Sequence, residues 1–265
     1  MAQMTITIFS QSLKRFTDFC LILPTDTPPE FAGQNPAYQR PPKTLFLLHG
    51  YSGSMHDFLF SGNAQNLAMK YNLAIVCASG ENSFYLNQKG TGRAYGDYFG
   101  VELPAYLQKT FGIAKTPEET MIGGFSMGGF GALHVGLSHP EQFGSIIALS
   151  SALIIHQVAT MTPGFSNPVA DYDYYAQTFG DPAAVLTSRS NPEVLVRDLK
   201  VAGAAIPSIY MACGTEDFLV ESNRAFAAFL KEQQVPVKYE EGPGVHNWDF
   251  WNPHMDAAIR YHLGM

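Results

Sequence analysis

The chain has 265 residues, of which 46% are hydrophobic and 15% are charged, and its formal net charge is −7. This length and composition predict one large α/β domain with a sizeable core. The negative charge offers no basic surface for nucleic acid and disfavours contact with anionic membranes. Small neutral molecules are therefore the expected partners.

The three cysteines, Cys20, Cys77 and Cys213, are far apart and lie in or beside apolar runs, which predicts buried free thiols. No metal-ligand spacing is present, so we expect no metal and no other cofactor. Residues 1–9 lack the basic and apolar regions of a signal peptide, and no apolar run is long enough to span a bilayer. These features predict a cytoplasmic protein with no membrane contact.

Apolar periodicity predicts an alternation of strands and helices after an initial strand pair. Two strands, at residues 5–9 and 18–23, have no helix between them and are expected to form an antiparallel edge. The proline-rich residues 24–43 are expected to form a loop. The later expected strands cover residues 44–48, 73–78, 121–122, 145–150, 207–213 and 235–240. The expected helices cover residues 55–71 with a break at 61–63, 98–111 with a weak point at Pro104, 127–138, 220–234 and 253–263. This order predicts a mostly parallel central sheet with helices on both faces.

A glycine-rich motif, Gly124-Phe125-Ser126-Met127-Gly128, lies between an expected strand and an expected helix. In a nucleophile elbow, the serine of such a G-x-S-x-G pattern lies in a strained strand-to-helix turn that exposes its hydroxyl group. The flanking glycines are needed because side chains there would collide with the strand and the helix. The same pentapeptide also occurs in turns that only pack, so the assignment depends on finding partners for Ser126.

Residues 151–200 interrupt the alternation of strands and helices. They contain Pro163-Gly164, a tyrosine cluster and helical segments that follow two further prolines. Because this insertion follows a strand whose carboxyl end faces the Ser126 turn, we interpret it as a small helical cap over the site. The alternative is a peripheral helical layer. With no repeat and no linker, residues 1–265 are expected to form a single domain, with the cap insertion at about 151–200.

Two loops after late strands contain the partners that a serine nucleophile needs, a base and a carboxylate that orients it. Glu216 and Asp217 follow the strand at 207–213, and His246 follows the strand at 235–240 in a glycine-rich loop. The carboxyl ends of parallel strands meet at one edge of a sheet, and the order Ser, Asp, His is that of α/β-hydrolases. Either Glu216 or Asp217 can face the site on this reasoning. No other histidine follows a late strand in such a loop, and His49, which ends a buried strand, is interpreted as structural.

Acyl transfer also requires backbone N–H groups that stabilise an oxyanion. Met127, the residue after Ser126, is expected to provide one of them. The second is expected from the loop after the strand at 44–48, from Tyr51 or else Ser52. Four aromatic residues are candidates for the walls of the substrate pocket, although aromatic residues at such positions also serve as core: Phe58, Phe125, Trp248 and Trp251.

Taken together, several segments resemble the putative-esterase family of α/β-hydrolases, which includes tributyrin esterases, acetyl-xylan and feruloyl esterases, esterase D and the mycolyltransferases. The segments are 47–53, 82–85, 124–132, 213–219 and 246–251. The likeness is greatest to the intracellular tributyrin-esterase branch. It implies the α/β-hydrolase fold and matches Ser126, Asp217 and His246 to the family's catalytic triad, which selects Asp217 over Glu216. By analogy with such relatives, a homo-oligomer is a candidate state.

The activity implied by this resemblance is hydrolysis of short-chain oxygen esters, of acetyl to butyryl type, through an acyl-enzyme and without a cofactor. Alternatives with related chemistry are an S-formylglutathione-type thioesterase, an acyltransferase of the mycolyltransferase type, and a feruloyl or acetyl-xylan esterase. An alternative of another class is a non-catalytic binding protein on a hydrolase scaffold. The complete set of serine, aspartate and histidine argues against that last alternative.

Overall fold

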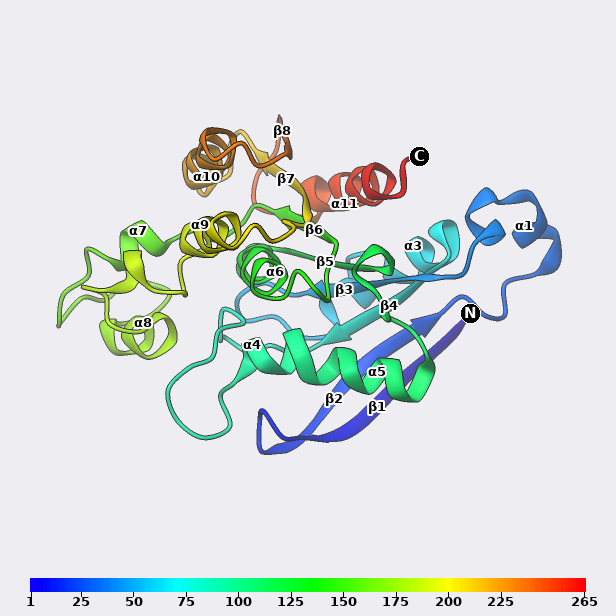
Figure 1. Cartoon of the computed structure of the whole chain (residues 1–265), viewed down its shortest axis with the longest axis horizontal. Coiled ribbons are helices and arrows are strands. Elements are labelled where there is room, and N and C mark those ends of the chain that lie inside the picture. The colour runs from blue at the N-terminus through cyan, green and yellow to red at the C-terminus, as the bar shows by residue number, and fades with distance from the viewer.

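The structure, a computed structural model, describes all residues from 1 to 265. A single eight-stranded sheet with the order β1-β2-β4-β3-β5-β6-β7-β8 forms its centre (Figure 1). Strands β3 to β8 pair in parallel, whereas β1 and β2 form the expected antiparallel edge. The strands are β1 (Ala2–Ser10), β2 (Arg15–Leu23), β3 (Lys43–Leu48), β4 (Leu73–Ala78), β5 (Thr120–Phe125), β6 (Ser145–Leu149), β7 (Ser208–Gly214) and β8 (Val237–Gly242).

Helices cover both faces of this sheet, as expected (Figure 1). They are α2 (Asp57–Phe60), α3 (Ala64–Tyr71), α4 (Tyr95–Asp97), α5 (Leu103–Phe111), α6 (Met127–Ser138), α10 (Val220–Glu232) and α11 (Trp248–Leu263). None of the helices in the chain has both the length and the apolar character that crossing a bilayer requires.

The continuous apolar runs of the central strands are explained by two cores on opposite faces of the sheet. Successive side chains of a strand point to opposite faces. In β3, Phe46 and Leu48 therefore join the core under α5 and α6, whereas Leu45 and Leu47 join the core under α3 and α11. A strand that is buried on both faces needs mostly apolar side chains at successive positions, which is why these runs show no alternation.

Prolines lie in the first turns of helices in two regions, the expected loop at 24–43 and the expected weak point at Pro104. Within residues 24–43, the prediction of a continuous loop is wrong, because Pro29 starts the short helix α1 (Pro29–Gln34) and Pro36 starts a 3₁₀ turn. Proline suits the first helical positions, where its missing N–H has no partner to lose. Pro104 likewise lies in the first turn of α5, which follows α4 through a π-helical turn.

The last helix, α11, begins at Trp248 and not at Pro253, so that predicted boundary is also wrong. The side-chain oxygen of Asn247 accepts a hydrogen bond from the Phe250 N–H at 3.2 Å and caps the helix. Pro253 is accommodated inside the helix. Trp248 and Trp251 therefore lie on the first turn of a helix that packs on the sheet.

The residues between β6 and β7 form three helices, α7 (Ile155–Val158), α8 (Tyr172–Phe179) and α9 (Pro192–Ala202). Helices α7 and α8 lie together at the left-hand end of the view in Figure 1, with α9 beside α6. Helix α8 contacts the loop after β3, since the rings of Tyr174 and Tyr51 meet edge to face with centroids 5.9 Å apart. A covering role for these helices stays a prediction.

Candidate active site

Ser126 lies in a strained turn between β5 and α6. Its φ of 56° and ψ of −121° are rare for any residue other than glycine. Neighbouring backbone holds it there, since the Ser126 N–H donates to the Leu149 carbonyl at 2.9 Å and the Ser126 carbonyl accepts from the Ala152 N–H at 2.9 Å. The side chain is only partly buried. This is the geometry expected of a nucleophile elbow.

The glycines at 124 and 128 allow this turn to lie against β3. A Cβ atom on Gly128 would come within 2.0 Å of the Leu48 carbonyl oxygen, and one on Gly124 within 2.6 Å of the same oxygen. Both distances are far below a van der Waals contact, and the opposing atom belongs to rigid backbone. The glycine spacing seen in the sequence is therefore required by the close approach of α6 to the sheet.

The structure brings Ser126, His246 and Asp217 together from the ends of three strands. The His246 Nε2 lies 2.9 Å from the Ser126 Oγ, and the His246 Nδ1 lies 2.8 Å from an Asp217 carboxylate oxygen. Since an ionised carboxylate only accepts hydrogen bonds, Nδ1 carries the proton and Nε2 is left to accept from the serine. The three side chains form one continuous chain of hydrogen bonds.

The Asp217 carboxylate is fully buried yet remains charged. Burial alone would raise its pKa, but hydrogen bonds from His246, the Leu219 N–H and Ser150 outweigh this and hold the pKa below its ordinary value. The Leu219 N–H donates at 2.9 Å. A negative charge is thus kept next to the Nδ1 proton of His246, whose own side chain is 21% exposed.

Glu216, the rival carboxylate in the sequence, makes no hydrogen bond to the imidazole. Its side chain accepts a hydrogen bond from the Gly244 N–H at 2.7 Å, and its own N–H donates to the Gly244 carbonyl at 3.0 Å. Glu216 therefore ties the loop that carries Asp217 to the loop that carries His246.

Two backbone N–H groups near Ser126 have no acceptor. Met127 is the first residue of α6, so its N–H has no partner inside the helix. The Tyr51 N–H also makes no hydrogen bond, whereas the Ser52 N–H donates to the Asn82 side-chain oxygen at 2.8 Å. Tyr51 and Ser52 were the two candidates in this loop for the second oxyanion donor. Of these, Tyr51 is the one whose N–H is free for a ligand.

His49 supports the loop after β3 and makes no hydrogen bond to Ser126, Asp217 or His246. Its Nε2 accepts from the Gly80 N–H at 2.8 Å, so its Nδ1 carries the proton and donates to the Gly50 carbonyl at 2.7 Å. The ring is 1% exposed, and burial lowers the pKa of His49, so it remains neutral. These contacts are structural.

The four aromatic candidates for the pocket form one cluster beside His246. The Phe125 ring stacks on Trp251 with centroids 4.3 Å apart, and Phe58 and Trp248 pack edge to face at 5.3 Å. Trp248 is partly exposed, and the other three rings are buried. Trp251 meets the His246 ring edge-on at 4.9 Å, so the cluster also supports the imidazole.

Two further side chains at the site were not recognised from the sequence. The Ser150 Oγ accepts a hydrogen bond from the Trp251 indole N–H at 3.0 Å and also contacts Asp217. The exposed Phe218 ring packs against His246 with centroids 4.7 Å apart. Ser150 carries no sequence signal, because it is a single serine directly after the apolar strand β6. Phe218 lies in the segment 213–219, next to Asp217, and this position could have identified it as a neighbour of the site.

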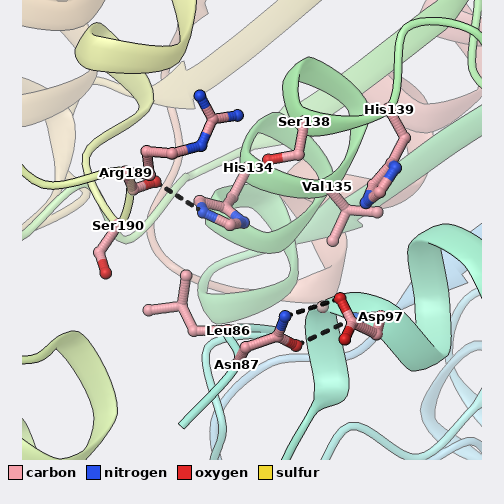
Figure 2. A pocket seen from close by; sticks show the side chains of 10 residues that line it. Leu86, Asn87, Asp97, His134, Val135, Ser138, His139, Arg189 and Ser190 are labelled. Atoms are coloured by element: carbon pink, nitrogen blue, oxygen red, sulfur yellow. Dashed lines mark hydrogen bonds between the residues drawn. The ribbon is translucent and has the colours of Figure 1, made fainter. Parts of the chain in front are cut away.

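A separate hollow of about 370 Å³ opens beside α6, away from the triad (Figure 2). It contains His134, whose Nε2 donates to the Arg189 carbonyl at 2.9 Å and whose pKa is lowered by burial to about 4. This histidine is therefore a neutral packing residue. No three His, Cys, Asp or Glu side chains lie together in a way that could hold a metal ion.

Comparison with known proteins identifies the family of the chain. Residues 10–262 match the family model described as Putative esterase. An acetyl esterase from Caldicellulosiruptor saccharolyticus is 43% identical over 261 residues, which are 98% of this chain and 98% of that protein. Among solved structures, the Staphylococcus aureus fluorophosphonate-binding serine hydrolase FphF superposes with a TM-score of 0.84 at 25% identity, covering 99% of this chain and 98% of FphF.

The S-formylglutathione hydrolase FrmB of Staphylococcus aureus superposes with a TM-score of 0.81 at 24% identity, covering 99% of this chain and 98% of FrmB. At that identity the likeness establishes the fold alone. The family match, by contrast, covers the chain almost from end to end and includes all three residues of the hydrogen-bonded chain. This protein belongs to the Putative esterase family and is a carboxylic ester hydrolase with the α/β-hydrolase fold.

Proposed function

We propose that this protein is a serine carboxylesterase that hydrolyses short-chain oxygen esters, of acetyl to butyryl type, through an acyl-enzyme. The observation that carries the proposal is the continuous hydrogen-bonded chain from Asp217 through His246 to Ser126. The similarity to an acetyl esterase over nearly the full length supports the short acyl group.

In the proposed mechanism, His246 Nε2 takes the proton of Ser126 as the Oγ attacks the ester carbonyl carbon. The N–H groups of Tyr51 and Met127 stabilise the resulting oxyanion. The bond from the carbonyl carbon to the alcohol oxygen then breaks, and His246 returns the proton to the leaving alkoxide. In the second half, His246 activates water, which releases the acid and restores Ser126. Asp217 holds the imidazole orientation and stabilises its charged form.

The direct test is turnover together with covalent labelling. The purified protein should hydrolyse nitrophenyl acetate, and a fluorophosphonate should form a single adduct on the peptide that contains Ser126. A protein that neither turns over nitrophenyl esters nor is labelled would instead be a non-catalytic member of the fold.

Short acyl chains are expected to be the best substrates. Phe58, Phe125, Trp248 and Trp251 are proposed to form one wall of the acyl site, and their close ring stacking leaves little room beside His246. In a panel of nitrophenyl esters of rising chain length, kcat/KM should be highest for acetyl or butyryl esters. Faster turnover of octanoyl or longer esters would show that the acyl site is open.

Oxygen esters are expected to be strongly preferred over S-formylglutathione. Thioesterases of this family typically carry histidines on both sides of the elbow, whereas this chain has Phe125 and Phe130 there. Phe130 is fully buried against Phe84 and serves as core, so charge is the stronger reason to expect this preference. Glutathione is anionic, and only Lys89 and Arg93 are basic between Lys70 and Lys109. The test is to measure kcat/KM for a butyryl ester and for S-formylglutathione side by side. A higher value for the thioester would contradict the expected preference for oxygen esters.

Activity is expected to fall on the acid side in a single step. A protonated His246 cannot accept the Ser126 proton, so kcat/KM should rise with pH and then level off. Asp217 should add no second step in this range, because its pKa is held below the ordinary value and it stays charged. The measurement is kcat/KM for nitrophenyl butyrate from about pH 5 to about pH 8. A flat profile, with acylation limiting, would be incompatible with an imidazole base.

The proposed setting is the cytoplasm, with a small neutral ester as the only ligand. All three cysteines are buried and free, and Cys20 and Cys77 face one another across β2 and β4 without a disulfide, as is usual in a reducing compartment. Fractionation of cells that express the protein tests the location. Sedimentation of the purified protein tests the proposed homo-oligomer.

A further inference from the structure

The loop after β4 braces the loop after β3 at three points. The Gly80 N–H donates to His49 Nε2 at 2.8 Å, and the Tyr85 hydroxyl donates to the His49 carbonyl at 2.9 Å. Further along, the Asn82 side-chain oxygen accepts the Ser52 N–H at 2.8 Å. The first two contacts fix the start of the β3 loop, and the third fixes its tip.

The tip is a tight turn with an unfavourable residue in it. The Gly53 N–H donates to the Gly50 carbonyl at 3.1 Å, which places Tyr51 and Ser52 at the two central positions. Ser52 has a φ of 63°, a conformation that turns normally reserve for glycine or asparagine. A serine in this conformation needs an external contact to hold it. Asn82 provides that contact, because it binds the N–H of Ser52 itself.

The orientation of the Tyr51 N–H follows from this turn. That N–H and the Gly50 carbonyl are opposite ends of one planar peptide unit, so fixing the carbonyl also fixes the N–H. The Gly50 carbonyl accepts from both His49 Nδ1 and the Gly53 N–H. The second of these bonds exists only while the turn keeps its shape, and Asn82 holds that shape at Ser52.

Asn82 also connects the turn to the inserted helices. Its backbone carbonyl accepts a hydrogen bond from the Tyr174 hydroxyl of α8 at 2.7 Å. The Tyr174 ring in turn packs against Tyr51. One residue thus contacts the turn through its side chain and the inserted helix through its backbone.

We infer that Asn82 is a positioning residue for ester hydrolysis, which holds the Tyr51 N–H toward the oxyanion and links that donor to α8. This inference rests on the proposed function. It predicts an effect on the transition state and not on substrate binding, because the carbonyl oxygen needs the N–H most when it becomes an oxyanion.

The test is Asn82→Leu, which keeps the size of the side chain and removes the acceptor. For nitrophenyl acetate, kcat should fall about a hundredfold, the loss expected from misplacing one catalytic donor, with KM unchanged. The affinity for a phenylboronic acid, whose tetrahedral adduct on Ser126 presents an oxyanion, should weaken by a similar factor. A rise in KM alone, or a lower kcat with full affinity for the boronic acid, would overturn the inference.

Asn87→Leu is the matched control, because Asn87 lies on the same loop and also makes side-chain hydrogen bonds. Its amide donates to Asp97 at 2.7 Å and its oxygen accepts the Asp97 N–H at 3.0 Å, beside the hollow in Figure 2. This variant should lose thermal stability without losing kcat. If the two leucine variants lose kcat equally, Asn82 is merely structural. If Asn82→Leu does not fold, Asn82→Ala removes the same acceptor without a bulky replacement and takes its place.

Tyr174→Phe tests the link to α8. It should lower kcat severalfold in the parent and have no further effect in Asn82→Leu, because the same donor is then already misplaced. Full additivity would contradict the link. The parent and Ser126→Ala are measured alongside: an inactive parent refutes the proposed function, whereas an active parent with an unimpaired Asn82→Leu refutes only the role of Asn82.

Discussion

Ser126→Ala should leave the protein folded and lower ester turnover by more than about 10³-fold, because binding and oxyanion stabilisation alone leave only a small residual acceleration over the reaction in water. Alanine removes only the Oγ atom that lies 2.9 Å from His246. The backbone bonds of the elbow to Leu149 and Ala152 do not involve this atom, so the strained turn should persist. Turnover of nitrophenyl acetate, thermal unfolding and fluorophosphonate labelling are the measurements.

Ser138→Ala is the control for this experiment. Ser138 ends the same helix, α6, and lies beside the hollow in Figure 2, away from the triad. Its replacement should change neither turnover nor labelling. Residual activity of Ser126→Ala above about one part in 10³ would mean that another residue is the nucleophile.

Asp217→Asn should lower kcat by about 10³-fold to 10⁴-fold while preserving the fold. The amide has nearly the shape of the carboxylate, but it carries no charge to stabilise the imidazolium and can present an N–H to Nδ1. His246 would then favour the tautomer with its proton on Nε2, which cannot accept from Ser126. The buried position of Asp217 makes the lost charge harder for solvent to replace.

Glu216→Gln is the matched comparison, because it removes one carboxylate charge from the adjacent residue. The Glu216 side chain accepts from the Gly244 N–H and makes no hydrogen bond to His246, and a glutamine oxygen can still accept the bond from Gly244. A much smaller loss of kcat is expected, with at most a modest change in melting temperature. A larger loss from Glu216→Gln than from Asp217→Asn would reverse the assignment of the carboxylate.

The sequence by itself determined the arrangement of the central elements. Buried parallel strands must be apolar on both faces, so β4 and α6 were predicted at the residues where they occur, Leu73–Ala78 and Met127–Ser138. The glycines around Ser126 could be interpreted from the sequence for a related reason. Where two backbone segments lie in van der Waals contact, there is no space for a Cβ atom, so only glycine fits. Local signals of this kind depend only on chain geometry and burial.

Helix boundaries near prolines were less predictable. The sequence pattern placed the start of the last helix at Pro253, whereas Asn247 caps it and the helix begins at Trp248. A proline can either end a helix or lie inside it, depending on whether packing against the sheet compensates for the lost hydrogen bond. That compensation comes from tertiary contacts.

Spacing within the sequence could not choose between neighbouring residues; the family resemblance favoured Asp217, and the tertiary structure shows how each candidate is oriented. Glu216 and Asp217 are adjacent, and so are Tyr51 and Ser52, so spacing along the chain cannot separate them. Asp217 reaches His246 because the loop turns its side chain inward, and the Tyr51 N–H is left free because Asn82, from a distant loop, binds that of Ser52. Hydrogen bonds between segments far apart in sequence set these orientations, and spacing along the chain carries no information about them.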